Sequence, residues 1–297
     1  MSLDFGWVIQ PVPHGDLETT DLHEYNRRAI AALPPQFTTL WMEDHLQWQE
    51  KPLLEAWTTL TYLAAEFPQY RFANMVLGQS YRNPALLAKM GATLQQLTGG
   101  RFTMGIGAGW KEDEYRAYGY EFPGAGVRVD QLIDTIQIMR AMWTQSPATY
   151  HGKRYHIEDA YCAPRPDPAI PILVGGNGDR ILRATARLAD AWNFATFSGT
   201  VEVMREKLAT LKRLCAEVGR DFGAIQLTYY GVIHLPDDPA DFKGSKGFQV
   251  LGPTSQDAIT QLQPFIDLGV THILLRTQNI ATLQRFGVEV APALASA

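Results

Sequence analysis

Three consecutive polar residues, Glu43, Asp44 and His45, follow the apolar run Phe37–Met42. A histidine flanked by carboxylates can be held in one tautomer and tuned near neutral pH, which suits proton transfer. The alternative is structural, with Asp44 capping a turn and His45 making an ordinary hydrogen bond. Because the triplet comes directly after a predicted strand, we expect Asp44 and His45 to be catalytic.

The segment GIGAGW contains glycines at alternate positions, including Gly107 and Gly109. Glycines at this spacing let the backbone approach a flat or phosphorylated ligand closely. A dinucleotide-binding turn would need GxGxxG opening an apolar helix, whereas Trp110 and the charged run KEDEYR follow here. We therefore expect Gly107 and Gly109 to contact a cofactor, but not in a Rossmann fold.

A second glycine-rich segment, GGNG, runs directly into a helix predicted to begin near Asp179. The free amide groups of Gly175, Gly176, Asn177 and Gly178, with the positive end of that helix, would cradle a phosphate. The alternative is an ordinary turn between a strand and a helix.

Further polar and aromatic side chains follow other predicted strands. Asn74 places an amide beside the bulky pair Met75 and Val76, and Thr196 offers a hydroxyl after a later strand. Trp48 and Trp110 are candidates for substrate binding, because aromatic rings at one barrel mouth would form an apolar slot. Most tryptophans, however, simply pack in a core or at its rim.

The charged residues around these motifs have simpler interpretations. Glu112, Glu114 and Arg116 are interpreted as a solvated or salt-bridged loop rather than as catalytic carboxylates. Arg82 could bind an anion, but pairing with a neighbouring carboxylate is favoured.

A metal site is the main chemical alternative. Glu43, Asp44, His45 and His234 could in principle share a cation, as in a metal-dependent barrel hydrolase. No HxH or HExxH spacing concentrates ligands, so we expect no metal.

Short β-branched or aromatic runs alternate with longer stretches whose apolar residues recur at three and four, which indicates repeated βα units. The predicted strands are Phe5–Gln10, Phe37–Met42, Tyr70–Leu77, Arg101–Gly107, Ile172–Gly175, Ala191–Thr196, Ile225–Ile233 and Thr271–Leu275. The predicted helices are Asp21–Leu33, Leu53–Glu66, Pro84–Leu97, Val127–Trp143, Asp179–Leu188, Val201–Val218, Ser255–Leu268 and Asn279–Val290.

This alternation predicts an α/β protein folded as a single (β/α)₈ TIM barrel over residues 1–297, although a doubly wound open sheet fits the same periodicity. The 297 residues exceed the usual barrel length of about 250. Two long connections account for the excess: an ordered insertion, Thr144–Pro171, before the fifth strand, and Pro236–Pro253 after the seventh. The second is a candidate lid or a surface loop without a role.

The composition excludes several classes of function. A net charge of −5 produces no field that would attract nucleic acid. Cys162 and Cys215 form neither a disulfide framework nor a metal clip, which favours the cytoplasm. We expect no membrane partner, because the chain has no stretch of about 18 apolar residues and no leader pattern at its start.

Taken in order, five motifs resemble the bacterial luciferase-like oxidoreductase superfamily, and in particular its branch that depends on coenzyme F420. These motifs are WMEDHL, YRNPALLAK, GGRFTMGIGAGWKEDEY, PILVGG and ADAWN. The resemblance spans Phe5 to Leu294.

The resemblance implies a TIM barrel that binds FMN or the deazaflavin F420 at the carboxyl ends of its strands. The phosphate would lie at the glycine turn after the fifth strand. Asn74 and a non-prolyl cis peptide at Met75-Val76 would support the ring, and Thr196 would be a further cofactor contact. The family's histidine maps to His45, and its insertion after the seventh strand maps to Pro236–Pro253.

One departure bears on the substrate: Trp110 stands where the F420-dependent sugar-phosphate dehydrogenases have a glutamate. An apolar or aromatic-lined substrate pocket is therefore expected. F420 carries a polyglutamate tail, and the sequence shows no dense basic cluster to receive it, so FMN stays an alternative.

The resulting prediction is an oxidoreductase that uses F420 or FMN for hydride transfer or monooxygenation of a small organic substrate. Pairing into a homodimer is compatible with the sequence. The alternatives are the metal-dependent hydrolase and a barrel that binds flavin without catalysis.

Overall fold

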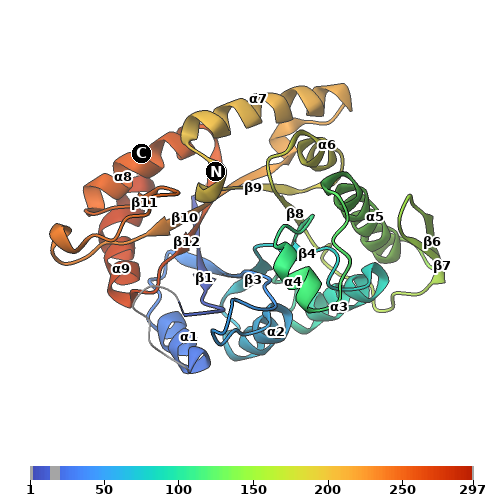
Figure 1. Cartoon of the computed structure of the whole chain (residues 1–297), viewed down its shortest axis with the longest axis horizontal. Coiled ribbons are helices and arrows are strands. Elements are labelled where there is room, and N and C mark those ends of the chain that lie inside the picture. The colour runs from blue at the N-terminus through green and yellow to red at the C-terminus, as the bar shows by residue number, and fades with distance from the viewer. Residues whose placement is uncertain (1–2, 14–20, 296–297) are drawn as a thin grey trace.

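A computed structural model describes residues 3–13 and 21–295. Within them, eight parallel strands close into a barrel (Figure 1). In ring order these are β1 (Asp4–Ile9), β2 (Phe37–Met42), β3 (Arg71–Asn74), β5 (Phe102–Gly107), β8 (Ile172–Gly175), β9 (Ala191–Ala195), β10 (Gln226–Ile233) and β12 (Val270–Arg276). Because β12 pairs with β1 and β9 pairs with β10, the ring has no open edge. The predicted (β/α)₈ barrel is confirmed and the open sheet is excluded.

The helices surround this barrel. They are α1 (Leu22–Ala31), α2 (Ala56–Glu66), α3 (Pro84–Leu97), α4 (Glu112–Ala117), α5 (Ala125–Thr144), α6 (Asp179–Leu188), α7 (Val201–Glu217), α8 (Ser255–Asp267), α9 (Ile280–Arg285) and α10 (Ala291–Ala295). The bounds of α3 and α6 are as predicted. Pro84 occupies the first turn of α3, and Gly99 and Gly100 leave it with φ of 62° and 89°.

Three stretches differ from the prediction. The predicted strand Tyr70–Leu77 is observed as β3 and, after the cis peptide Met75-Val76, the separate short strand β4 (Leu77–Gly78). The region interpreted as a loop after Trp110 contains the short helix α4. The last predicted helix, Asn279–Val290, consists of α9 and a π-helical turn at Phe286–Val290, and α10 follows beyond its predicted end. A single domain over residues 1–297 stays a prediction, because residues 1–2, 14–20 and 296–297 lie outside the described part.

Both long connections are ordered insertions. The first contains an antiparallel hairpin, β6 (Ala148–His151) with β7 (His156–Ala160), which packs beside α5 (Figure 1). The second contributes β11 (Val250–Leu251), which pairs with the end of β10 at the barrel mouth. A two-residue strand, β4 (Leu77–Gly78), pairs with β5 near the same level.

The apolar residues form two layers. A large cluster fills the space between strands and helices, and it contains the fully buried Trp7, Trp192 and Phe286. A smaller cluster, with Trp41, Met75 and Tyr230, fills the barrel interior. Burying each such large side chain stabilises the fold by about 1.5–3 kcal/mol, so the barrel is a rigid support for groups at its mouth. Among the described residues, no helix is long and apolar enough to cross a membrane.

Candidate active site

A cavity of ≈ 1580 Å³ opens at the carboxyl ends of the strands. It exceeds the roughly 300–1,000 Å³ typical of a small-ligand pocket, so it has room for a cofactor and a substrate together. Most of the residues predicted from the sequence line it: Asp44, His45, Trp48, Met75, Val76, Gly107, Gly109, Trp110, Gly175, Gly176, Asn177 and Gly178.

Asn74 and Thr196, also predicted to contact a cofactor, are not on the cavity wall. Asn74 is fully buried, and neither polar atom of its side chain has a hydrogen-bond partner. The hydroxyl of Thr196 donates to the carbonyl of Gln249, 2.8 Å away, and so ties β9 to the insertion after β10. The sequence placed both residues at the correct end of the barrel but could not show which way their side chains turn.

The three residues after β2 have three different surroundings. The side chain of Asp44 is held in place by hydrogen bonds within the protein. It accepts from both terminal nitrogens of Arg82, at 2.9 and 3.1 Å, and from the amide of Gly78. Arg82 also pairs with Glu55, so the prediction that Arg82 bonds a carboxylate is confirmed. With its oxygens occupied and its side chain fully buried, Asp44 can position His45 but presents no free oxygen to a ligand.

His45 meets a buried carboxylate that the sequence analysis missed. The Nδ1 atom of His45 lies 2.8 Å from Oε1 of Glu114 on α4, and the Tyr81 hydroxyl donates to the other oxygen at 2.9 Å. The Glu114 side chain is 0% exposed. The interpretation of Glu112, Glu114 and Arg116 as a solvated or salt-bridged loop is therefore wrong about the solvation of Glu114 and about the loop, but the salt bridges are present. Glu114 lies 3.5 Å from Lys111, and Glu112 and Arg116 form a surface ion pair.

The ionisation of Glu114 determines which ring nitrogen of His45 carries a hydrogen. Burial by itself raises the pKa of Glu114, but hydrogen bonds from His45 and Tyr81 and the charges of His45 and Lys111 bring that pKa below its usual value. The carboxylate is therefore ionised at neutral pH and can only accept, so Nδ1 of His45 carries a hydrogen. This leaves Nε2, which has no partner among the described residues, as the nitrogen available to the cavity.

Aromatic rings surround the histidine. Trp48 and Trp110 meet its ring edge to face, with centroids 5.2 and 5.9 Å away, and Lys111 lies over the Trp48 ring. Trp110 is 69% exposed although it lines the cavity, so its outer face is open to solvent. We refer to His45, Glu114, Trp48 and Trp110 as the histidine wall.

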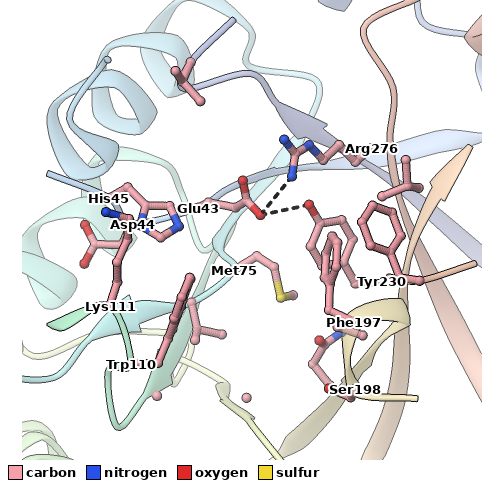
Figure 2. Close-up of a pocket in the computed structure, with 18 of the residues that line it drawn as sticks. Glu43, Asp44, His45, Met75, Trp110, Lys111, Phe197, Ser198, Tyr230 and Arg276 are labelled. Atoms are coloured by element: carbon pink, nitrogen blue, oxygen red, sulfur yellow. Dashed lines mark hydrogen bonds and ion pairs between the residues drawn. The ribbon is translucent and has the colours of Figure 1, made fainter. Parts of the chain in front are cut away.

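A second polar group of the cavity is formed by Glu43, which follows β2, by Tyr230 of β10 and by Arg276 of β12. The Tyr230 hydroxyl donates to Oε1 of Glu43 at 2.9 Å, and Nη1 of Arg276 lies 3.7 Å from the same oxygen. Figure 2 shows Tyr230 and Arg276 facing His45 and Trp110, with the Glu43 carboxylate and Met75 between them. We refer to Glu43, Tyr230 and Arg276 as the tyrosine wall.

The charges of the tyrosine wall compensate one another. Burial, and then the neighbouring Glu43, raise the pKa of Tyr230 well above its usual value, so the phenol stays protonated. Burial lowers the pKa of Arg276, but Tyr230 and Glu43 more than offset this and raise it overall. The wall is thus a neutral set of donors and acceptors at the cavity surface.

The floor between the walls is the peptide Met75-Val76, which is cis as the resemblance implied. The side chain of Val76 leaves little room for a side chain at two neighbouring positions, Gly107 and Gly175. A Cβ on Gly107 would lie 2.8 Å from one methyl group of Val76, and a Cβ on Gly175 would lie 3.0 Å from the other. Gly109, at φ 78°, is required by the protein itself, since a Cβ there would lie 1.9 Å from the Tyr115 hydroxyl. The floor is therefore glycine backbone with the apolar side chains of Met75 and Val76, which suits a flat ring.

The glycine turn before α6 is open to the cavity. Gly176 has φ 118°, and its carbonyl accepts a hydrogen bond from the Trp192 indole at 2.8 Å, which fixes the turn. Gly178 is the N-cap residue of α6. Because it has no side chain, it accepts no hydrogen bond from the first amides of the helix through a side chain. These features fit a phosphate group at this end of the cavity.

The geometry gives the metal-dependent alternative no support. Although Glu43, Asp44, His45 and His234 all line the cavity, no group of three or more His, Cys, Asp or Glu residues within 3–13 and 21–295 is placed to hold a metal ion. Nδ1 of His234 instead accepts from the amide of Lys243 at 3.0 Å.

The closed barrel presents its glycine turn and its oriented histidine at the carboxyl ends of the strands, where TIM-barrel enzymes have their active sites. A sequence model of the luciferase-like monooxygenase family matches residues 3–272, and the protein belongs to this family. The resemblance of its motifs to the luciferase-like superfamily is thereby confirmed.

Individual relatives share part of the chain. An uncharacterised protein of Mycobacterium bovis is 36% identical over 171 residues, 57% of each chain. An F420-dependent glucose-6-phosphate dehydrogenase of Kineococcus radiotolerans is 28% identical over 218 residues, which cover 71% of this chain and 64% of that protein. The matches thus span less than two thirds of the length of these relatives.

A solved structure extends the likeness to the whole fold. An F420-dependent secondary alcohol dehydrogenase in complex with an F420-acetone adduct superposes with a TM-score of 0.84 at 19% identity, covering 99% of both chains. Neighbours in fold and family use F420 or FMN.

Proposed function

We propose that this protein is an oxidoreductase that binds F420 or FMN in the barrel mouth and exchanges a hydride with a small organic substrate, or, with reduced FMN, supports monooxygenation. The observation that carries the proposal is the His45–Glu114 pair, whose free Nε2 faces a cavity with a flat floor and an open glycine turn. Family membership and F420-dependent relatives support the same assignment.

The glycine turn and the floor would hold the cofactor. Gly176, Asn177 and Gly178 offer backbone amides to its phosphate, and Met75-Val76 supports its ring. When bound, the cofactor supplies the hydride chemistry, and the protein supplies orientation and proton transfer.

His45 manages the proton that accompanies hydride transfer. If an alcohol is oxidised, Nε2 accepts the hydroxyl proton; if a carbonyl is reduced, Nε2 donates one to the oxygen. Glu114 stabilises the charged ring through Nδ1–H and holds its orientation, while Asp44 fixes the backbone beside it through Arg82. Glu114 and Asp44 are therefore positioning residues.

The tyrosine wall would hold the substrate. Arg276 presents donors, while Glu43 and the Tyr230 oxygen present acceptors, because the Tyr230 hydroxyl already donates its hydrogen to Glu43. Phe197 and Phe248 cover the same side with apolar surface. A compensated wall of this kind suits a neutral polar group on an apolar body better than a phosphate ester. Trp110, on the opposite wall, also suits such a substrate.

Cofactor binding is the direct test. Titrating the protein with F420 and with FMN while following cofactor fluorescence should show saturable binding of at least one at micromolar concentration. His45→Gln should bind with unchanged affinity, because His45 acts on the proton rather than on the phosphate. Failure of both cofactors to bind the wild type would contradict the proposal.

A further inference from the structure

Three cationic side chains converge on one carboxylate beside the glycine turn. Arg180 of α6 lies 2.7 Å from Asp130 of α5, and Lys153 and Arg154, from the turn between β6 and β7, lie 3.7 and 3.8 Å from the same carboxylate. We refer to Lys153, Arg154 and Arg180 as the basic rim. Its members come from separate segments, which explains why the sequence showed no dense basic cluster.

The basic rim carries more positive charge than the neighbouring carboxylates neutralise. Asp130 neutralises one of its three charges, and the buried Asp134, which accepts hydrogen bonds from the amides of Arg154 and Tyr155, offsets a second, so one positive charge is left over. The nearby Asp179 is itself 3.7 Å from Lys207. Lys153, Arg154 and Arg180 are 76%, 43% and 54% exposed, so their remaining donors face solvent. The separations of 3.7 and 3.8 Å are too long for close hydrogen bonds, which leaves Lys153 and Arg154 able to reach a second anion.

The rim continues outward from the end of the cavity that suits a phosphate. Arg180 follows Gly178 by two residues and donates to the carbonyl of Gly126 at 3.0 Å. Arg128, one turn into α5, lines the cavity and donates to the carbonyl of Gly109. Figure 1 shows α5, α6 and the β6–β7 hairpin side by side on one flank of the barrel. A ligand whose phosphate lay at the glycine turn could therefore extend a chain of carboxylates along this rim.

We propose that the basic rim binds the glutamate carboxylates of the F420 tail and so selects F420 over FMN. This inference rests on the proposed function, which requires only that one of the two cofactors binds. FMN ends at its phosphate and has no group that reaches the rim. When the tail binds, Lys153 and Arg154 would give up their long contacts with Asp130 and make contacts of the same kind with the carboxylates of the tail.

The test compares three ligands: F420 with its glutamate tail, the same deazaflavin without glutamates, and FMN. Their dissociation constants are measured by fluorescence with the wild type and with the double variant Lys153→Gln/Arg154→Gln, which changes only the exposed hairpin turn. Arg213→Gln is the matched control, because Arg213 is a 60% exposed arginine paired with Glu217 on the distant helix α7. Thermal unfolding of each variant shows that the fold is retained.

We expect the double variant to weaken binding of tailed F420 about 10-fold, about 3-fold for each surface charge removed. Binding of the tail-less deazaflavin and of FMN should change less than about 2-fold, and Arg213→Gln should change nothing. The advantage of tailed over tail-less F420 should also shrink as salt is raised.

Equal affinity of the wild type for tailed and tail-less F420, or equal weakening of both by the double variant, would overturn the inference and leave the proposed function standing. If no deazaflavin and no FMN bound to the wild type, the proposed function itself would fail.

Discussion

The two walls of the cavity use similar residue types in opposite ways. On the histidine wall the carboxylate of Glu114 is fully buried behind the His45 ring, so only the imidazole faces the cavity. On the tyrosine wall the carboxylate of Glu43 is itself at the cavity surface, beside two donors. Glu43 and His45 are two residues apart in the chain, yet they belong to different walls.

The comparison of Glu114 with Glu43 shows that the groups a carboxylate contacts, more than its residue type, determine what it does in the site. A carboxylate behind an imidazole orients it and stabilises its charge, which affects the rate of proton transfer. A carboxylate held between a phenol and a guanidinium is part of a binding surface, which affects how a substrate is held. We therefore expect substitutions in the histidine wall to lower kcat and substitutions in the tyrosine wall to raise KM.

The largest effect is expected for His45→Gln, which keeps a polar side chain but removes the proton-transfer group. kcat should fall about 100- to 1,000-fold, the usual contribution of general acid–base catalysis. The assay uses the alcohol or carbonyl compound that turns over fastest in a panel of small substrates. His156→Gln, on the exposed β6–β7 hairpin, is the control. A kcat within about twofold of the wild type would remove His45 from the chemistry.

A smaller loss, about 10-fold in kcat, is expected for Glu114→Gln, because the ring keeps a neighbour but loses the negative charge that stabilises its protonated form. Glu112→Gln, on the exposed side of α4, is the matched control.

The Glu114 substitution also has a signature in stability. The pKa of Glu114 is lowered in the folded state, so the unfolded chain binds more protons and ionised Glu114 stabilises the fold above its ordinary pKa of 4.5. The difference in unfolding free energy between the wild type and Glu114→Gln should therefore be largest near pH 7. It should shrink as the pH falls through 4.5 and below. Denaturant titrations at several pH values measure this, and a difference that grows on acidification would contradict the assignment.

The sequence predicted the barrel and most of the cavity lining because both follow from local patterns. Each strand end lies at the mouth by topology, so polar residues such as His45 and glycines such as Gly178 could be placed without side-chain detail. Glu114 was missed because its helix, α4, has six residues, too few to show a helical period. An inward-facing Glu114-Tyr115 pair between the outward Glu112 and Arg116 was the only signal.

Contacts between distant segments could not be predicted in the same way. Tyr230 and Glu43 are separated by 187 residues, and their hydrogen bond depends on how two strands turn their side chains at the mouth. The basic rim likewise depends on how the β6–β7 hairpin packs against α5. Alternation of strands and helices defines the order of these elements but not the directions of individual side chains.

The central claim is that the histidine wall acts on the rate of proton transfer and the tyrosine wall on substrate binding. It is tested most directly by Tyr230→Phe in the steady-state assay used for His45→Gln. The substitution removes the hydroxyl that donates to Glu43 and keeps the ring. Tyr229→Phe is the control, because Tyr229 stacks on Phe265 and does not line the cavity. We predict that KM rises about 5- to 10-fold, the loss of about one hydrogen bond, while kcat stays within about twofold. A kcat that falls as far as in His45→Gln, with KM unchanged, would contradict the account.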